Sequence, residues 1–149
     1  MSSAGVTTEI RTFNDAGKAD DQSRIAWITV ANEQRLNCLS TAIVSQLRDE
    51  FEKLADNNEI RAIVLTGAGT RSFIGGADLN ELGSLDHDGE RLYITNLHKA
   101  CRAIRISPHP VIARINGFCL GAGLEIAASC DMRVASDDAV FGMPEVHMG

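Results

Sequence analysis

The C-terminal half of the chain contains the stretch PVIARINGFCLGAGLE, which runs from Pro110 to Glu125. Its first part, Val111–Ile115, is apolar and rich in β-branched residues, as expected of a buried strand. Asn116-Gly117 is a turn signal, and the almost wholly apolar segment Gly121–Ser129 predicts a short helix. A buried strand, a turn and an apolar helix in direct succession indicate an α/β fold.

The same alternation of strands and helices extends to both sides of this stretch. Ser40 is a suitable helix N-cap, and a polar loop at Gly83–Gly89 precedes a second helix, which Pro108 and Pro110 end. The predicted apolar helix faces are Ile43, Leu47, Phe51 and Leu54, then Tyr93, Leu97, Cys101 and Ile104. The predicted strands are 7–13 and 24–31, paired across the polar turn 14–23, and 61–66, 111–115 and 132–135. This order predicts α/β with a largely parallel sheet.

Composition and charge narrow the class of protein. The chain has 149 residues, 44% of them hydrophobic and 23% charged, which is globular and neither disordered nor collagen-like. Its 14 Lys+Arg against 20 Asp+Glu give a net charge of -6, and an acidic protein is repelled by nucleic-acid phosphates. No stretch approaches the ~20 apolar residues of a membrane helix. We therefore expect no nucleic-acid or membrane partner.

The cysteines and the N-terminus indicate the cellular compartment of the protein. The four cysteines are widely spaced, without a Cys-x-x-Cys pair, which is typical of reduced thiols. Residues 1–8 lack the basic start and the apolar stretch of a secretory signal. We expect a plain N-terminal tail at 1–8, a core at 9–149 and a cytoplasmic location.

Two glycine-rich loops follow apolar strands. Gly67-Ala68-Gly69 has the first two glycines of a dinucleotide loop, but Ser72 stands where the third belongs, so a tight turn is the better interpretation. The loop 116–123 opens a helix whose first amides lack partners and carry partial positive charge, which suits an anion or a developing oxyanion. Close helix packing explains its small residues equally well.

Two glutamates are candidates for chemistry. Glu125 is the only charged residue between Arg114 and Asp131, and a carboxylate on an apolar helix is costly unless it is paired or faces a cavity. This favours a functional role over helix-dipole complementation. Glu145 taken alone is most simply an exposed acid in a helix's first turn, but a pair of carboxylates is what general acid–base catalysis uses.

Other catalytic classes have no support. The four histidines show no metal-ligand spacing, no Gly-x-Ser-x-Gly nucleophile motif occurs, and no metal site is predicted. The basic face formed by Arg91, Lys99, Arg102 and Arg105 is most simply a solvated helix face.

Five segments, in their order along the chain, resemble the enoyl-CoA hydratase/isomerase (crotonase) superfamily. They are LNCLS at 36–40, SFIGGADL at 72–79, PVIARING at 110–117, GAGLE at 121–125 and FGMPE at 141–145. The resemblance implies a spiral of ββα units and hydration of a 2-enoyl-CoA, as in fatty-acid β-oxidation. It implies that no metal or redox cofactor is needed, because coenzyme A is part of the substrate. It also implies assembly into homotrimers or hexamers.

The resemblance also assigns residues. The amides of Ala77 and Ala122 would form the oxyanion hole for the thioester carbonyl, and Glu125 and Glu145 would hold the water between them. The residues implied along the substrate and coenzyme A path are Arg35, Leu36, Ala77, Asp78, Leu79 and Gly121.

Three points follow from the family pattern. The family continues beyond this point with helices that complete the acyl pocket and the trimer, so we expect a core cut short at its C-terminal end. Another reaction of the same scaffold is an alternative: isomerisation, carnitinyl-CoA dehydration, dehalogenation or decarboxylation. A non-catalytic acyl-CoA-binding subunit is the alternative from a different class.

Overall fold

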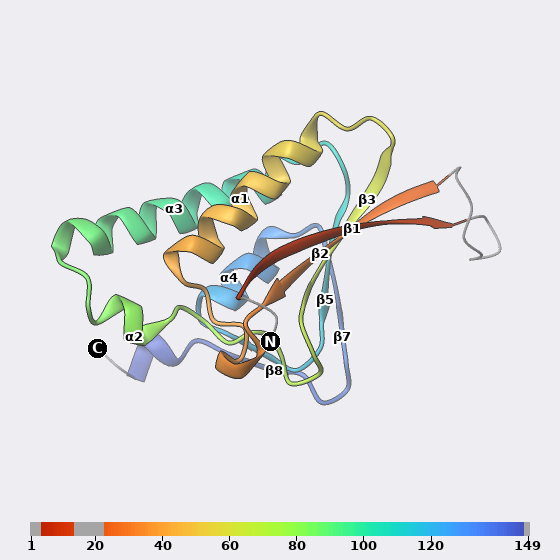
Figure 1. Ribbon diagram of the computed structural model, residues 1–149. Helices are drawn as coiled ribbons and strands as arrows, with labels where there is room; N and C mark the ends of the chain where they lie inside the picture. The colour runs from red at the N-terminus through yellow and green to blue at the C-terminus, as the bar shows by residue number, and fades with distance from the viewer. Residues whose placement is uncertain (1–3, 14–22, 148–149) are drawn as a thin grey trace.

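The computed structural model describes residues 4–13 and 23–147, whose strands form two sheets (Figure 1). The strands are β1 (Gly5–Phe13), β2 (Ser23–Ala31), β3 (Ile60–Gly67), β4 (Ser72–Ile74), β5 (Val111–Ile115), β6 (Phe118–Leu120), β7 (Met132–Ala135) and β8 (Val140–Gly142). The larger sheet has the order β1-β2-β3-β5-β7 and the smaller one β4-β6-β8. Only the β1–β2 pair is antiparallel. The predicted, largely parallel sheet is thus confirmed.

The helices fill the connections between strands. They are α1 (Thr41–Ala55), α2 (Leu79–Leu82), α3 (His87–Arg105) and α4 (Ala122–Ser129), with short 3-10 turns η1 (Glu33–Arg35) and η2 (Pro144–His147). Helix α3 packs against both α1 and α4. Over the described ranges, no helix combines the length and the apolar character needed to cross a membrane.

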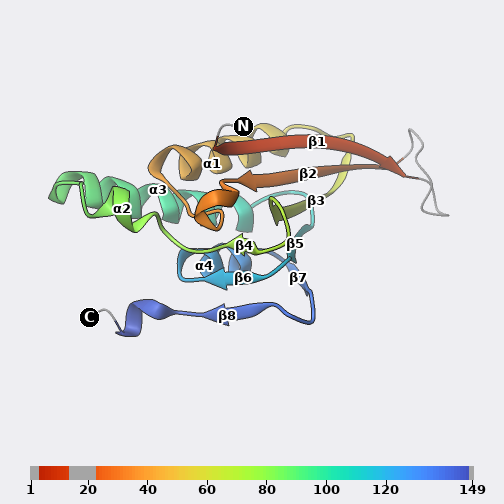
Figure 2. The ribbon, with the colours of Figure 1, turned by 60° about the horizontal axis from the view of Figure 1, so that its bottom comes forward.

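From β3 onward, each turn of the chain adds one strand to each sheet. Strands β3 and β4, then β5 and β6, then β7 and β8 enter the larger and the smaller sheet in alternation, with α2 and α3 or α4 between the turns. Figure 2 shows β4, β6 and β8 lying one below another. This is the expected spiral of ββα units.

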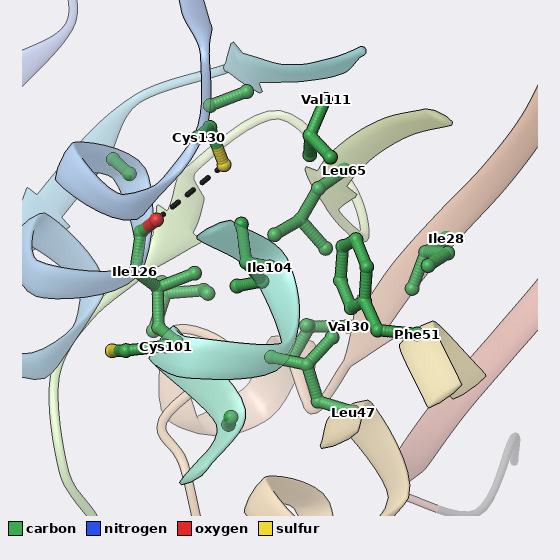
Figure 3. Close-up of a cluster of buried hydrophobic side chains, with 14 of the residues drawn as sticks. Ile28, Val30, Leu47, Phe51, Leu65, Cys101, Ile104, Val111, Ile126 and Cys130 are labelled. Carbon is green, nitrogen blue, oxygen red and sulfur yellow. Dashed lines mark hydrogen bonds between the residues drawn. The ribbon is translucent and has the colours of Figure 1, made fainter. Parts of the chain in front are cut away.

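The core lies where α1, α3 and α4 meet the larger sheet. Figure 3 shows side chains from these helices and from β2, β3 and β5 converging there, among them Phe51, Leu65 and Ile104. Both predicted apolar helix faces are buried. Removing a buried Leu or Phe side chain from such a core typically costs ~2–5 kcal/mol, so this packing fixes the helices against the sheet.

Side-chain caps set where the helices begin. The Ser40 hydroxyl accepts from the amide of Ile43 at 3.2 Å, as predicted for α1. The carboxylate of Asp86 accepts from the amide of Gly89 at 2.8 Å, so α3 begins at His87. The loop expected over residues 83–89 is therefore too long, because its polar residues provide the cap and first turn of the helix.

The smaller sheet was not predicted from the residues. Its strands have three residues each, too few for an alternating pattern to emerge. Strands β4, β6 and β8 follow β3, β5 and β7 of the larger sheet at equivalent turns of the spiral. This places Ser72 opposite Phe118 and Phe118 opposite Val140.

The N-terminal strand is longer than expected. Residues 5 and 6, which precede the strand expected at 7–13, belong to β1 and pair with β2, and the Val6 amide also donates to the side chain of Gln46 at 2.9 Å. These hydrogen bonds hold a segment that has little hydrophobic pattern. Residues 1–3 of the expected tail and 14–22 of the expected turn lie outside the described residues.

Candidate active site

A cavity of about 400 Å³ lies between the β4–α2 loop, α3, the start of α4 and η2. Its wall is mostly apolar, with Leu79, Leu82 and Leu97 on one part and Met143 on another. Two carboxylates, Glu125 and Glu145, complete it. A second groove of about 410 Å³ lies between α1 and α3 and contains none of the predicted site residues. The first cavity is therefore the candidate site.

Ala77 lines this cavity and takes part in a single β-bridge that does not use its amide. The Leu39 amide donates to the Gly76 carbonyl at 2.8 Å, and the Asp78 amide donates to the Leu39 carbonyl at 2.9 Å. Because the Gly76 carbonyl and the Ala77 N–H belong to one trans peptide group and point in opposite directions, the Ala77 N–H points away from Leu39. Within the part of the chain that the structure describes, it donates to no acceptor.

The amide of Ala122 is open for a different reason. Ala122 is the first residue of α4, and the first amides of a helix have no intrahelical partner. The amides of Leu124 and Glu125 both donate to the Gly121 carbonyl, at 2.8 and 3.2 Å, and the Ala122 N–H donates to nothing within the described ranges. The two residues with these unpaired N–H groups, Ala77 and Ala122, line one cavity, and the second lies at the positive end of a helix dipole.

The two glutamates reach the cavity from different elements. Glu125 lies in the first turn of α4, and Glu145 in η2, where its carboxylate packs against the Cα of Gly121. Gly121 has a φ of +50°, and an added Cβ would overlap the Glu145 carboxylate. Both glutamates are exposed. The burial cost argued from the neighbours of Glu125 is therefore not incurred, because its side chain faces a cavity open to solvent.

The predicted substrate path is only partly in the cavity wall. Ala77, Leu79 and Gly121 line it, whereas Arg35, Leu36 and Asp78 lie beside it. The Arg35 guanidinium pairs with the Asp78 carboxylate, which is 9% exposed and also accepts from the amides of Asn80 and Glu81. These two charges are thus engaged with each other and with the start of α2. The role of this segment in binding coenzyme A stays a prediction.

The backbone before α1 supports the β4–α2 loop. The Leu36 carbonyl accepts from the Gly75 amide and from the Ser72 hydroxyl, each at 2.8 Å. The side chain of Asn37, 1% exposed, donates to the carbonyls of Ala68 and Ser72 at 2.9 and 2.8 Å. These bonds fix the segment that carries Ala77.

Tyr93 is a cavity residue that sequence reasoning placed only in the core. Its ring lines the cavity and its hydroxyl donates to the Leu39 carbonyl at 3.0 Å. A signal was present, because a tyrosine on a buried helix face needs a partner for its hydroxyl. The partner itself is 54 residues away in the chain, and no local pattern identifies it.

No group of three or more His, Cys, Asp or Glu side chains within residues 4–13 and 23–147 is arranged to hold a metal ion. The three cysteines Cys101, Cys119 and Cys130 are buried, and burial raises the pKa of each thiol. They take no part in the cavity wall.

Comparison with known proteins gives a consistent result. Residues 20–149 match the family model described as enoyl-CoA hydratase/isomerase. The chain is 36% identical over 130 residues to the short-chain-enoyl-CoA hydratase of Clostridium acetobutylicum, covering 87% of this chain and 50% of that protein. It is 32% identical to the crotonyl-CoA hydratase of Syntrophomonas wolfei, with the same coverage.

Solved structures agree with the sequence matches. An enoyl-CoA hydratase from Bacillus anthracis superposes with a TM-score of 0.82 at 31% identity, covering 84% of this chain and 48% of that one. Pseudomonas aeruginosa DspI superposes with a TM-score of 0.84 at 32% identity, covering 97% of this chain and 50% of that one. The chain spans about half the length of the curated relatives it matches.

Proposed function

The chain belongs to the enoyl-CoA hydratase/isomerase (crotonase) family, and on that premise we propose that its cavity binds a 2-enoyl-CoA thioester and adds water across the double bond. The observation that carries the proposal is the meeting of two unpaired amides and two carboxylates in one cavity. The hydratase names of the relatives at 36% and 32% identity support the same reaction.

The two amides act on the thioester oxygen. When the oxygen of water bonds to the β-carbon of a conjugated thioester, negative charge moves onto the thioester oxygen and an enolate forms. The N–H groups of Ala77 and Ala122 donate to it, and the dipole of α4 assists the second of them. Since both are backbone groups held in place beforehand, they need no reorganisation as the charge develops. One such donor is typically worth ~2.7–4 kcal/mol.

The two glutamates handle the water. Glu125 accepts a proton from the water as its oxygen attacks the β-carbon, and Glu145 supplies the proton that completes the α-carbon. A C–O bond forms at the β-carbon and a C–H bond at the α-carbon, while one O–H bond of the water and the π bond of the C=C break, so the reaction consumes no oxidant or reductant. After the product leaves, the proton that Glu125 took replaces the one that Glu145 gave, and both glutamates return to their starting state. General acid–base steps of this kind contribute ~10²–10⁴-fold each.

The apolar wall receives the acyl group. Leu79, Leu82 and Leu97 line the cavity on the side of α2 and α3, where burial of alkyl carbons contributes roughly 0.8 kcal/mol per methylene. Assembly into trimers or hexamers, a cytoplasmic location and a role in β-oxidation stay predictions.

The test is turnover of crotonyl-CoA, followed by loss of its conjugated absorbance. We expect Glu125→Gln and Glu145→Gln each to abolish hydration, because each removes a proton-transfer group while keeping its shape. Binding of saturated butyryl-CoA, measured by calorimetry, should stay within several-fold. Glu52→Gln is the matched control, since Glu52 is an exposed acid of α1 outside the cavity.

The outcomes separate the alternatives. Near-full turnover by Glu145→Gln would show that Glu145 is an ordinary acid near a helix start, and it would contradict the two-glutamate mechanism. A protein that binds butyryl-CoA and leaves crotonyl-CoA unchanged would be either a non-catalytic subunit or an enzyme for another reaction on the same scaffold.

A further inference from the structure

Tyr93 connects α3 to the loop that carries the Ala77 amide. It is the only tyrosine of the chain and is 1% exposed. Its hydroxyl donates to the Leu39 carbonyl at 3.0 Å. Burial raises the pKa of the phenol well above its usual value, with a further contribution from the Glu81 carboxylate. The hydroxyl therefore stays protonated, and stays a donor, throughout the physiological range.

The Leu39 carbonyl has a second donor, the amide of the residue that follows Ala77. The Asp78 amide donates to the same oxygen at 2.9 Å, while the Leu39 amide donates to Gly76 at 2.8 Å. Leu39 thus bonds to the peptide groups on both sides of Ala77. The direction of the Ala77 N–H depends on the orientation of the Leu39 peptide.

This bridge stands alone rather than within a strand ladder. Leu39 and Ala77 form an isolated parallel bridge, and Gly76 next to it has a φ of +119°, outside any regular strand. An isolated pair of hydrogen bonds lacks the neighbouring rungs that hold a residue inside a sheet. A third bond from a residue anchored in the long helix α3 restricts the carbonyl at the centre of the junction.

We propose that the Tyr93 hydroxyl is a positioning group for the oxyanion site, holding the Ala77 amide in its productive direction through the Leu39 carbonyl. The inference rests on the proposed function, because it concerns how well that amide meets the thioester oxygen. Tyr93 itself touches no reacting atom in this scheme. Groups that stabilise a transition state must be held to within about 0.5 Å, and the hydroxyl supplies part of that restraint.

The test reads the amide's effect on a bound carbonyl directly. Butyryl-CoA labelled with ¹³C at the thioester carbonyl cannot be hydrated, and the infrared frequency of its C=O stretch falls when hydrogen bonds polarise the carbonyl. We expect a downshift on binding to the wild-type protein and a smaller downshift with Tyr93→Phe. The dissociation constant should change by less than about threefold, because most of the contact surface is untouched.

Turnover gives a second reading that a merely structural role would not produce. With crotonyl-CoA, Tyr93→Phe should lower kcat about tenfold and leave KM within about threefold, since the Ala77 donor is used most in the transition state. The control is Thr66→Val, which also removes a buried hydroxyl. Thr66 bonds to Arg114 and Asn116 at 2.9 and 3.2 Å, away from the cavity. It should lose stability and keep the full downshift.

The outcomes distinguish this inference from the proposed function. A wild-type protein that produces no downshift overturns the oxyanion site itself. A wild-type downshift that Tyr93→Phe retains in full overturns only the positioning role.

If Tyr93→Phe does not fold, 3-fluorotyrosine can replace the single tyrosine throughout the chain, strengthening the donor with little change in shape. The carbonyl frequency must then move from the wild-type value, and an unchanged frequency overturns the proposal.

Discussion

Replacing Gly123 with alanine tests how tightly α4 is seated. A Cβ at this position would lie 2.9 Å from both the carbonyl carbon and the Cβ of Ile74 in β4, and closer still to the Ile74 carbonyl oxygen. Ordinary contact begins at 3.4 Å, so α4 must move away from β4 by more than about 0.5 Å. A catalytic group must be held to within about that distance of its working position. Alanine gains up to ~1 kcal/mol in helix propensity over glycine, but overpacking against backbone costs ~1–3 kcal/mol.

We therefore expect Gly123→Ala to be destabilised or unchanged in urea unfolding and to lose about a hundredfold in turnover, because a displacement near 1 Å can cost that much. Both the Ala122 amide and Glu125 move with the helix. Gly142→Ala is the matched control, since its added Cβ would meet only the flexible side chain of Leu120 at 3.3 Å. A Gly123→Ala protein with full stability and full turnover would refute the close packing of α4 on β4.

Two further predictions concern the Ala122 amide and a buried thiol. Proline is favoured at the first position of a helix, so Ala122→Pro should keep the fold, as measured by circular dichroism. It removes the N–H and should therefore lose at least ~2.7 kcal/mol of transition-state stabilisation. Ala122→Gly should keep most activity, and equal activity of the two variants would contradict the oxyanion role. Burial raises the pKa of the Cys130 thiol from about 9 to about 12, so the unfolded chain ionises first as the pH rises. The contribution of this thiol to stability should be constant below pH 9 and be lost between pH 9 and about 12. Burial raises the pKa of Cys101 and Cys119 as well, so Cys130→Ala should reduce the alkaline loss of stability in urea unfolding without abolishing it.

The larger sheet and its helices could be predicted because their signals are local and repeated. The face of α1 recurs every three or four residues, and Ser40 supplies a cap at the right distance. Strands β5 and β7 have the bounds expected from their apolar runs, Val111–Ile115 and Met132–Ala135. The smaller sheet has no such signal, because three-residue strands become strands only when the spiral brings them together.

The site residues were predicted from motifs more than from physics. The apolar neighbours of Glu125 left two possibilities, a charged partner or a cavity, and the side chain lines a cavity open to solvent. The resemblance to a family supplied Ala77 and Ala122, since a backbone amide leaves no trace in the residue type. Tyr93 was missed as a site residue because its partner, Leu39, is distant in sequence. Long-range contacts of this kind are visible only in the folded chain.

The start of α4 shows why three small residues occur in succession. Gly121 needs a positive φ and gives room to the Glu145 carboxylate, while Gly123 lets the helix approach the Ile74 carbonyl. Between them, the Ala122 amide is left without an acceptor among the described residues. The close packing requires the glycines, and it holds the free amide and both carboxylates around one cavity. Close packing therefore explains the small residues, and it is compatible with the oxyanion role that we propose for the amide left free between them.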